Sequence, residues 1–464
     1  MNYLNEPLYS LGAYNEIAAE ISEGRTPVLL SGVIETQKCH IAAALIGERP
    51  AIFITASERA AKAAYEDLRY FLRDRVMYYP FKDIIFYSAD VKSINITRDR
   101  LNVLDALMSG SKPVIVLSVE ALFDRLTPQE VFYEYILELA VADEMPIAAL
   151  AAKLVPMGYE RVEMVEAPGQ FAVRGGIVDI YTTLYENALR IEFWGDEVDS
   201  IRLLDSASQR SIEKLGSVRL FPMREFVYGD TAISSVCKKI RVDLDTALTR
   251  LAKDGKDEAA INLRAAIGEH LEKFSQKISF KTADRYINYF YPQANSLLDY
   301  LPDDALLFFD EPARLAEHAG VVLEEFSESI MNKIEKGYMM PTQANLVLTY
   351  ADIVRKSTRF ASVLLAHMPR QMKEFSPKAV HSITVRPTMT LRQRIDLLLD
   401  DLRHYTRADY RIAILCSSRT RGQRLAQEIA DEGLPTTFVD DLHTTPLKPG
   451  IVTVAPGSLN KGFE

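Results

Sequence analysis

The chain has 464 residues, of which 48% are hydrophobic and 25% charged, and a formal net charge of −10 at pH 7. This length exceeds what one hydrophobic core usually fills, so we expect three or four domains. The acidic net charge argues against nucleic-acid binding through bulk charge, and three scattered cysteines suggest neither disulfides nor a zinc site. The absence of a signal peptide or a run of ~20 apolar residues predicts a cytoplasmic protein.

The first part of the chain, residues 1–135, alternates short apolar strands with amphipathic helices. Strands are expected at 28–30, 51–54 and 114–117. Such strands are typical of a parallel sheet that is buried on both faces. We therefore predict the first half of an α/β lobe.

The segment after the first strand resembles a phosphate-binding loop with altered chemistry. In the pattern G-x-x-x-x-G-K-[ST] read from Gly32, Lys38 is kept, but Gln37 replaces the second glycine and Cys39 the hydroxyl residue. Glutamine resists the open backbone that glycine permits, and a thiol is a poor ligand for Mg²⁺. Glu35 adds a carboxylate where phosphate would lie. We interpret the loop as a degenerate nucleotide site; an ordinary buried βα unit with a chance lysine is the alternative.

Arg98 and Arg100 stand near the start of the helix predicted around 101–108. They could line a nucleic-acid groove. Basic residues beside an acid are more often a solvated face, which is the interpretation we favour.

Residues 136–222 show short strands of alternating polarity separated by glycines, a pattern that predicts a small α+β domain. The clearest strand, 189–194, sends Arg190, Glu192 and Trp194 to the face opposite the core, and 199–204 repeats the pattern as an antiparallel neighbour. Two interpretations of this face are open. Trp194 and Arg190 form an interface anchor, or Trp194 caps a core edge while Arg190 pairs with Glu192 or Asp179 as a surface salt bridge.

Residues 223–345 return to helices, including a long charged one near 258–275, and then to an apolar strand that ends in Asp310 and Glu311. A carboxylate pair at this place holds Mg²⁺ and water in helicase-type ATPases. Without a competent phosphate loop, a relic or structural role is favoured. The strand predicts a single lobe interrupted by the inserted domain.

We interpret residues 346–378 as a linker and 379–464 as a separate small α/β domain. Its elements are expected at 391–405 (helix), 411–416 (strand), 421–432 (helix) and 450–454 (strand). The sequence stops without a cap or polar tail, so we expect this domain to be truncated at its carboxy-terminal end.

Three segments of the inserted domain, 157–162, 169–180 and 190–197, resemble in order and spacing the domain shared by the repair protein UvrB and the Mfd family of transcription-repair coupling factors. Further segments resemble the coupling factors and not UvrB, which carries a tyrosine-rich hairpin near the first of them. These segments are 79–83, 209–213, 221–226, 301–304 and 457–464.

The resemblance implies a helicase-like lobe with a UvrB-homology insertion, followed by a small domain. It implies that the 136–222 domain binds UvrA through Arg174, Arg190 and Trp194. It also implies that RNA polymerase and DNA are contacted only by regions beyond Glu464, that a carboxy-terminal translocase there is restrained by this module, and that this part of the protein uses no cofactor or metal.

Three functions compete. The first is a noncatalytic adaptor that recruits UvrA to stalled RNA polymerase. The second is an ATP-dependent enzyme that loads onto damaged DNA, as UvrB does, against which Gln37 and Cys39 argue. The third is an architectural spacer.

Overall fold

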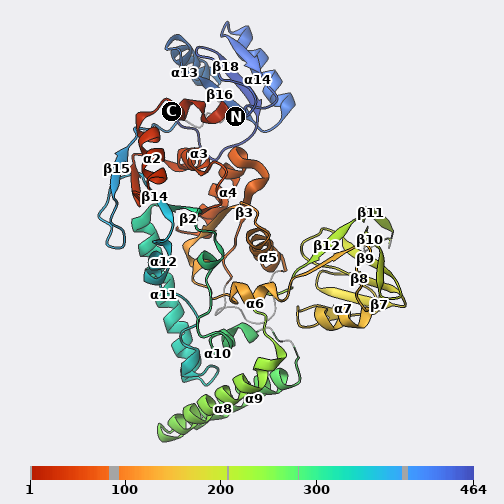
Figure 1. Ribbon diagram of the computed structural model, residues 1–464. Helices are drawn as coiled ribbons and strands as arrows, with labels where there is room; N and C mark the ends of the chain where they lie inside the picture. The colour runs from red at the N-terminus through yellow and green to blue at the C-terminus, as the bar shows by residue number, and fades with distance from the viewer. Residues whose placement is uncertain are drawn as a thin grey trace.

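The structure is a computed structural model that describes residues 3–82, 94–205, 208, 210–278, 280, 282–388 and 395–464. Figure 1 shows an α/β lobe from which a β-rich domain and a long helical hairpin project, with a small α/β domain at the other end. Parts of three predicted segments, namely Asp83, Gln209 and residues 391–394, lie outside the described residues. Within the described ranges, none of the helices has the length and apolar character that crossing a membrane requires.

The lobe is built on a seven-stranded parallel sheet with the order β15-β1-β14-β13-β2-β4-β3. Its strands are β1 (Val28–Ser31), β2 (Ala51–Thr55), β3 (Val76–Tyr78), β4 (Val114–Ser118), β13 (Leu306–Asp310), β14 (Ala361–Ala366) and β15 (Ala379–Ser382). Alternate residues of a strand enter two separate cores: in β13, Leu307 and Phe309 enter one, Leu306 and Phe308 the other. Burial on both faces explains the continuous apolar runs that predicted this sheet.

Helices cover both faces of the sheet, as predicted. On one face lie α2 (Gly12–Ser22), α3 (Glu35–Ile46) and α4 (Glu58–Leu72). On the other lie α5 (Ile94–Met108), α11 (Pro312–Glu335) and α12 (Tyr350–Ser357). Short turns of helix complete the lobe: η1 (Tyr3–Asn5), α1 (Glu6–Tyr9), η2 (Arg73–Arg75), η3 (Val119–Leu122), α6 (Gln129–Tyr133), η5 (Leu297–Tyr300) and η6 (Pro341–Gln343).

The lobe is assembled from segments on both sides of the inserted domain. β13 pairs with β2 on one side and with β14 on the other, so the prediction of one interrupted lobe is confirmed. The prediction of a linker over 346–378 is wrong, because this segment contains α12 and the central strand β14. β15, at the start of the predicted small domain, also belongs to this sheet through β1.

The inserted β-rich domain holds a six-stranded sheet with the order β11-β10-β9-β8-β7-β6. Its strands are β6 (Glu160–Arg161), β7 (Gln170–Arg174), β8 (Ile177–Ile180), β9 (Ala188–Trp194), β10 (Glu197–Leu204) and β11 (Ser211–Leu215). One face packs with α7 (Ile147–Leu154) and with the pair β5 (Leu137–Ala140) and β12 (Ser217–Leu220) in a core of its own. The strand predicted at 189–194 and its antiparallel neighbour are confirmed.

The helical hairpin consists of α8 (Asp230–Lys253) and α9 (Asp257–Ser275), the second being the charged helix that the sequence predicted. The two helices pack on η4 (Ala283–Tyr286) and α10 (Ile287–Phe290) through an aromatic core. Figure 1 shows the hairpin projecting from the lobe beside α10.

The small domain has a three-stranded parallel sheet with the order β16-β18-β17. Its elements are α13 (Ile395–Arg407), β16 (Ile412–Cys416), α14 (Arg419–Asp431), β17 (Thr436–Phe438) and β18 (Val452–Pro456). The predicted elements are confirmed to within a few residues, except that the start of α13 lies outside the described residues. β17 was not predicted because three residues give too short a pattern.

Arg100 does not lie on a solvated face, so that prediction is wrong. Its side chain is 0% exposed, with Nη2 2.7 Å from Asp124 Oδ2, Nη1 donating to the Pro80 carbonyl (2.9 Å) and Nε donating to Glu225. The guanidinium also lies 4.1 Å from the Tyr79 ring centroid. These partners come from distant parts of the chain, so the local charge pattern did not reveal them.

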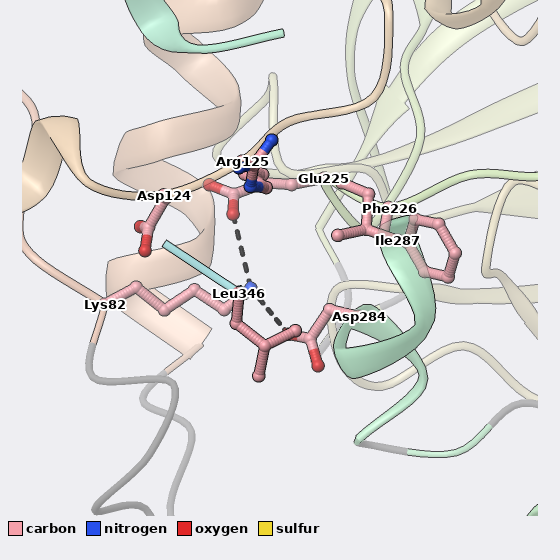
Figure 2. A pocket seen from close by; sticks show the side chains of 8 residues that line it. All are labelled: Lys82, Asp124, Arg125, Glu225, Phe226, Asp284, Ile287 and Leu346. Atoms are coloured by element: carbon pink, nitrogen blue, oxygen red, sulfur yellow. Dashed lines mark hydrogen bonds and ion pairs between the residues drawn. The ribbon is translucent and has the colours of Figure 1, made fainter. Parts of the chain in front are cut away.

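Lys82 extends this group into a buried charge cluster, which we define as Lys82, Arg100, Asp124, Glu225 and Asp284. Figure 2 shows Lys82 between two carboxylates, with Nζ 3.3 Å from Glu225 and 3.0 Å from Asp284. Burial opposes ionisation of Glu225, but Arg100 and Lys82 outweigh it and lower its pKa, while burial raises the pKa of Asp124 to about 6. The cluster ties the lobe to the chain that leaves β12 and to the base of the hairpin.

We predict that Arg100→Met destabilises the protein by about 3–5 kcal/mol, because it leaves buried carboxylates without their main counter-charge. Urea unfolding followed by far-UV circular dichroism measures the change. Arg98→Met is the matched control: the Arg98 side chain is exposed and, among the described residues, forms an ion pair with its neighbour Asp99 alone, so the change should shift stability by less than about 0.5 kcal/mol. Equal effects of the two variants would contradict a structural role for the cluster.

Candidate functional site

The loop between β1 and α3 has the backbone of a tight strand-to-helix turn. Gly32 has φ +81°, and a Cβ there would lie 2.0 Å from the Ile383 carbonyl oxygen, so only glycine fits. α3 begins at Glu35, which places Gln37, Lys38 and Cys39 within the helix. The N–H groups of Gln37 and Lys38 both donate to the Ile34 carbonyl (2.9 and 3.3 Å). Both N–H groups therefore form hydrogen bonds within the first turn of α3.

Lys38 meets the acidic pair that the sequence predicted at the end of β13. Its Nζ lies 2.6 Å from Asp310 Oδ1 and 2.6 Å from Glu311 Oε1, and its side chain is only 7% exposed. Burial works against the charge of Lys38, but the two carboxylates outweigh it and raise its pKa. We call Lys38, Asp310 and Glu311 the lysine–carboxylate triad.

The two carboxylates of the triad differ in environment. Burial raises the pKa of Asp310, with Lys38 opposing the rise. Burial also acts against ionised Glu311, but the hydrogen bond from Lys38 leads the contacts that lower its pKa overall. Glu311 Oε1 further accepts the His367 N–H (2.8 Å), which fixes the loop after β14. The charge that a phosphate would need on Lys38 is thus balanced by the protein's own groups.

Gln37 and Cys39 are buried, and Cys39 packs in the hydrophobic core between α3 and α4. Burial raises the pKa of the Cys39 thiol well above its ordinary value, so the sulfur stays protonated. A protonated thiol is a poor metal ligand. Of the six residues of the predicted nucleotide site, the structure therefore joins Lys38, Asp310 and Glu311 directly, while Gly32 shapes the loop and Gln37 and Cys39 are buried in α3.

A further contact at this place was missed by the sequence analysis. Residues 457–464, which we call the terminal strap, contact α3 and α4 through Lys461 and Asn460. They also contact α13 and the loop that follows it through Glu464, which accepts hydrogen bonds from Tyr405 and Tyr410. The Lys461 N–H donates to Thr36 Oγ1 (3.1 Å), Thr36 donates to Asp67 Oδ2 (2.7 Å), and the Asn460 N–H donates to Asp67 Oδ1 (2.8 Å). Asn460 Nδ2 also reaches the Ala63 carbonyl (2.9 Å). The strap thereby fastens the small domain to the lobe.

The face of β9 predicted as an interface lies at the edge of the molecule in the β-rich domain (Figure 1). Trp194 is 84% exposed, while the alternating residues Leu189, Ile191 and Phe193 are buried. The prediction that the indole points outward is confirmed, and a core-edge cap is excluded. Beside Trp194 is the turn of Gly175 and Gly176, where the Phe193 N–H donates to the Gly176 carbonyl (2.8 Å), so no side chain from this turn covers the indole.

Both predicted arginines converge on one carboxylate. Arg190 donates from Nε to Asp179 Oδ1 (2.7 Å) and from Nη2 to Oδ2 (2.9 Å), and Arg174 Nη2 donates to the same Oδ2 (2.5 Å). The pairing of Arg190 with Asp179 that the sequence left open therefore exists. It is not a surface salt bridge, because the Asp179 side chain is only 2% exposed.

Comparison with known proteins supports the identification of this domain. Residues 137–226 match the family model of the UvrB interaction domain, and this range includes Arg174, Arg190 and Trp194. The fold and this match define the class of the protein: a helicase-like α/β lobe that carries an inserted UvrB interaction domain.

Relatives extend the similarity to the rest of the chain. The transcription-repair-coupling factor of Bacillus subtilis (strain 168) is 31% identical over 457 residues, which cover 97% of this chain and 38% of that protein. The corresponding proteins of Staphylococcus haemolyticus and Staphylococcus epidermidis (strain ATCC 12228) are 26% and 25% identical over 95% of this chain and 37% of their own length. The chain is therefore related, over nearly its whole length, to the amino-terminal region of transcription-repair-coupling factors. It spans less than two fifths of the length of these relatives.

We predict that Asp67→Ala loosens the small domain from the lobe, because Asp67 accepts hydrogen bonds from both Thr36 and the strap. Loss of a buried acceptor costs about 2 kcal/mol, which corresponds to roughly thirtyfold more frequent opening. Limited proteolysis between β15 and β16 measures it. Glu66→Ala, at the exposed neighbouring position, should leave the cleavage rate unchanged. Equal rates in the two variants would show that the strap does not hold the domains together.

Proposed function

We propose that this chain is a noncatalytic adaptor that binds the repair protein UvrA through the domain predicted over 136–222. The observation that supports it most is the exposed indole of Trp194 on a face shared with Arg190 and Arg174, within the range matched by the UvrB interaction domain. Tryptophan and arginine are the residues most enriched among interface hot spots, because both bury large areas and arginine pairs bidentately with carboxylates.

The relatives' names, transcription-repair-coupling factor, support a proposal for the wider role. We propose that the chain links stalled RNA polymerase to nucleotide excision repair as part of a longer protein. In that protein, RNA polymerase and DNA would be contacted by regions that this chain does not include, among them an ATP-dependent translocase. The same module would contact and restrain that translocase.

We also propose that the nucleotide site of this lobe is inactive and needs no cofactor. Three features support this: Lys38 is neutralised by Asp310 and Glu311, the N–H groups of Gln37 and Lys38 are engaged, and the Cys39 thiol is buried. An ATP-dependent enzyme that loads onto damaged DNA would need these groups for phosphate and Mg²⁺.

We predict that Arg190→Ala and Trp194→Ala each weaken UvrA binding by about 2 kcal/mol or more, which is roughly thirtyfold in Kd. Isothermal titration calorimetry with purified UvrA measures it. Arg161→Ala, an exposed arginine on the edge strand β6, is the control and should keep the original affinity. Unchanged binding in both test variants would remove the assigned site, and no binding by the original chain would favour an architectural spacer.

We predict that ATP with Mg²⁺ gives no binding heat at concentrations up to about 1 mM and no hydrolysis, since the lysine that would meet the phosphates is already paired. Lys38→Ala should leave this result unchanged. Micromolar affinity that disappears in Lys38→Ala would contradict the adaptor and favour the enzyme.

A further inference from the structure

The outward face of the sheet around Trp194 contains a carboxylate, Asp179, that is buried although its neighbours on the face are partly exposed. Asp179 lies in β8 directly opposite Arg190 of β9, on the same outward face, yet it is buried beneath the two arginines. A buried aspartate normally requires full hydrogen bonding to remain charged. Here Arg190 and Arg174 supply three hydrogen bonds.

These three bonds fix the two guanidinium groups. Arg190 binds Asp179 through two parallel N–H donors, a geometry that sets the plane of the guanidinium as well as its position. Arg174 comes from β7, on the opposite side of β8, and shares Oδ2 with Arg190. Without the carboxylate, two like charges would lie close together on long, flexible side chains.

The clamped arginines keep different exposures. The side chain of Arg174 is 48% exposed and that of Arg190 is 21% exposed, so both can still reach a partner. Next to them, Arg202 Nη2 contacts Glu192 Oε2 (3.1 Å), and Ser200 donates to the same oxygen (2.7 Å). Arg174, Arg190 and Arg202 pair with only two carboxylates, Asp179 and Glu192, so this group of five side chains carries more cations than anions. A partner of matching chemistry presents carboxylates beside an apolar pocket for the indole.

We propose that Asp179 is a positioning residue of the UvrA-binding face: it orients Arg174 and Arg190 in advance for carboxylates of the partner. This inference rests on the proposed function. Side chains that are already ordered lose less conformational entropy on binding, so the pairing within the chain raises the affinity for a partner that it does not itself touch.

The test compares UvrA binding by Asp179→Asn, Arg190→Ala and the double variant. Asparagine keeps the shape of Asp179 and removes its charge. We expect Kd to rise at least tenfold in Asp179→Asn, and much less when the same change is made in the Arg190→Ala background, because the two residues act through one contact. Asp179→Glu, which restores the charge, should recover part of the affinity. Glu186→Gln, an exposed carboxylate in the β8–β9 loop, is the matched control and should bind normally.

A second measurement separates positioning from folding. In ¹⁵N-arginine-labelled protein without UvrA, the Nε–H signal of Arg190, assigned by its loss in Arg190→Ala, should exchange slowly with solvent and should do so rapidly in Asp179→Asn. The far-UV circular dichroism spectrum and the urea-unfolding midpoint of Asp179→Asn should match those of the original chain if the sheet remains folded. If they differ, the Asp179→Glu variant and the double variant decide whether the loss of affinity comes from positioning or from unfolding.

The outcomes distinguish this inference from the adaptor itself. If Arg190→Ala weakens binding while Asp179→Asn does not, or if the two effects simply multiply, Asp179 is not a positioning residue although the adaptor stands. If neither Arg190→Ala nor Trp194→Ala weakens binding, the assigned face fails, and the inference fails with it.

Discussion

The parallel pairing of β13 with β2 and β14 is the constraint on which the rest of the structure depends. Because the carboxyl ends of parallel strands meet at one edge of the sheet, this pairing carries Asp310 and Glu311 to the loop that follows β1. The lysine–carboxylate triad is a direct result. The chain between β4 and β13 leaves the lobe and returns to the same sheet. The β-rich domain and the helical hairpin are therefore insertions between two strands of one continuous sheet.

The chain uses one chemical device, a cation held by carboxylates, in two settings with opposite consequences. In the triad, Lys38 is buried and both of its carboxylates come from the lobe, so little of its charge remains for an outside anion. On the β-rich domain the roles of exposure are reversed: the carboxylate of Asp179 is buried, while the arginines above it still reach solvent. The proposed inactive nucleotide site and the proposed partner-binding face therefore differ in the exposure of the cation, although both contain salt bridges.

The sequence predicts those features of the fold and of the candidate site that depend on residues close together in the chain. A period of two predicted the orientation of Trp194 because neighbouring residues of a strand must point to opposite faces. Asp179 was one of two candidate partners of Arg190, and the structure places it directly opposite Arg190 on the neighbouring strand β8. In contrast, the ion-pair partners of Arg100 are Asp124 and Glu225, and nothing in the sequence around Arg100 indicates them. The sequence predicts a linker where β14 lies for a similar reason, since the neighbouring strands β1 and β13 are far away in sequence. The terminal strap depends on contacts between residues about 400 positions apart, such as Asn460 with Asp67.

The buried charge cluster anchors one of the two chain segments that connect the β-rich domain to the lobe. The β-rich domain has its own core, and its outward face lies on strands that do not touch the lobe's sheet. Two segments, before β5 and after β12, connect it to the lobe, and the second passes through Glu225. Glu225 is held at once by Arg100 of the lobe and by Lys82, which also binds Asp284 at the base of the hairpin. These ion pairs hold the segment after β12 against the lobe, and Arg219 of β12 adds an ion pair with Asp105 of α5 (2.7 Å). The proposed UvrA-binding face lies on a domain with its own core, separate from the core beside the lysine–carboxylate triad, so the proposed loss of the nucleotide site would not by itself disturb that face.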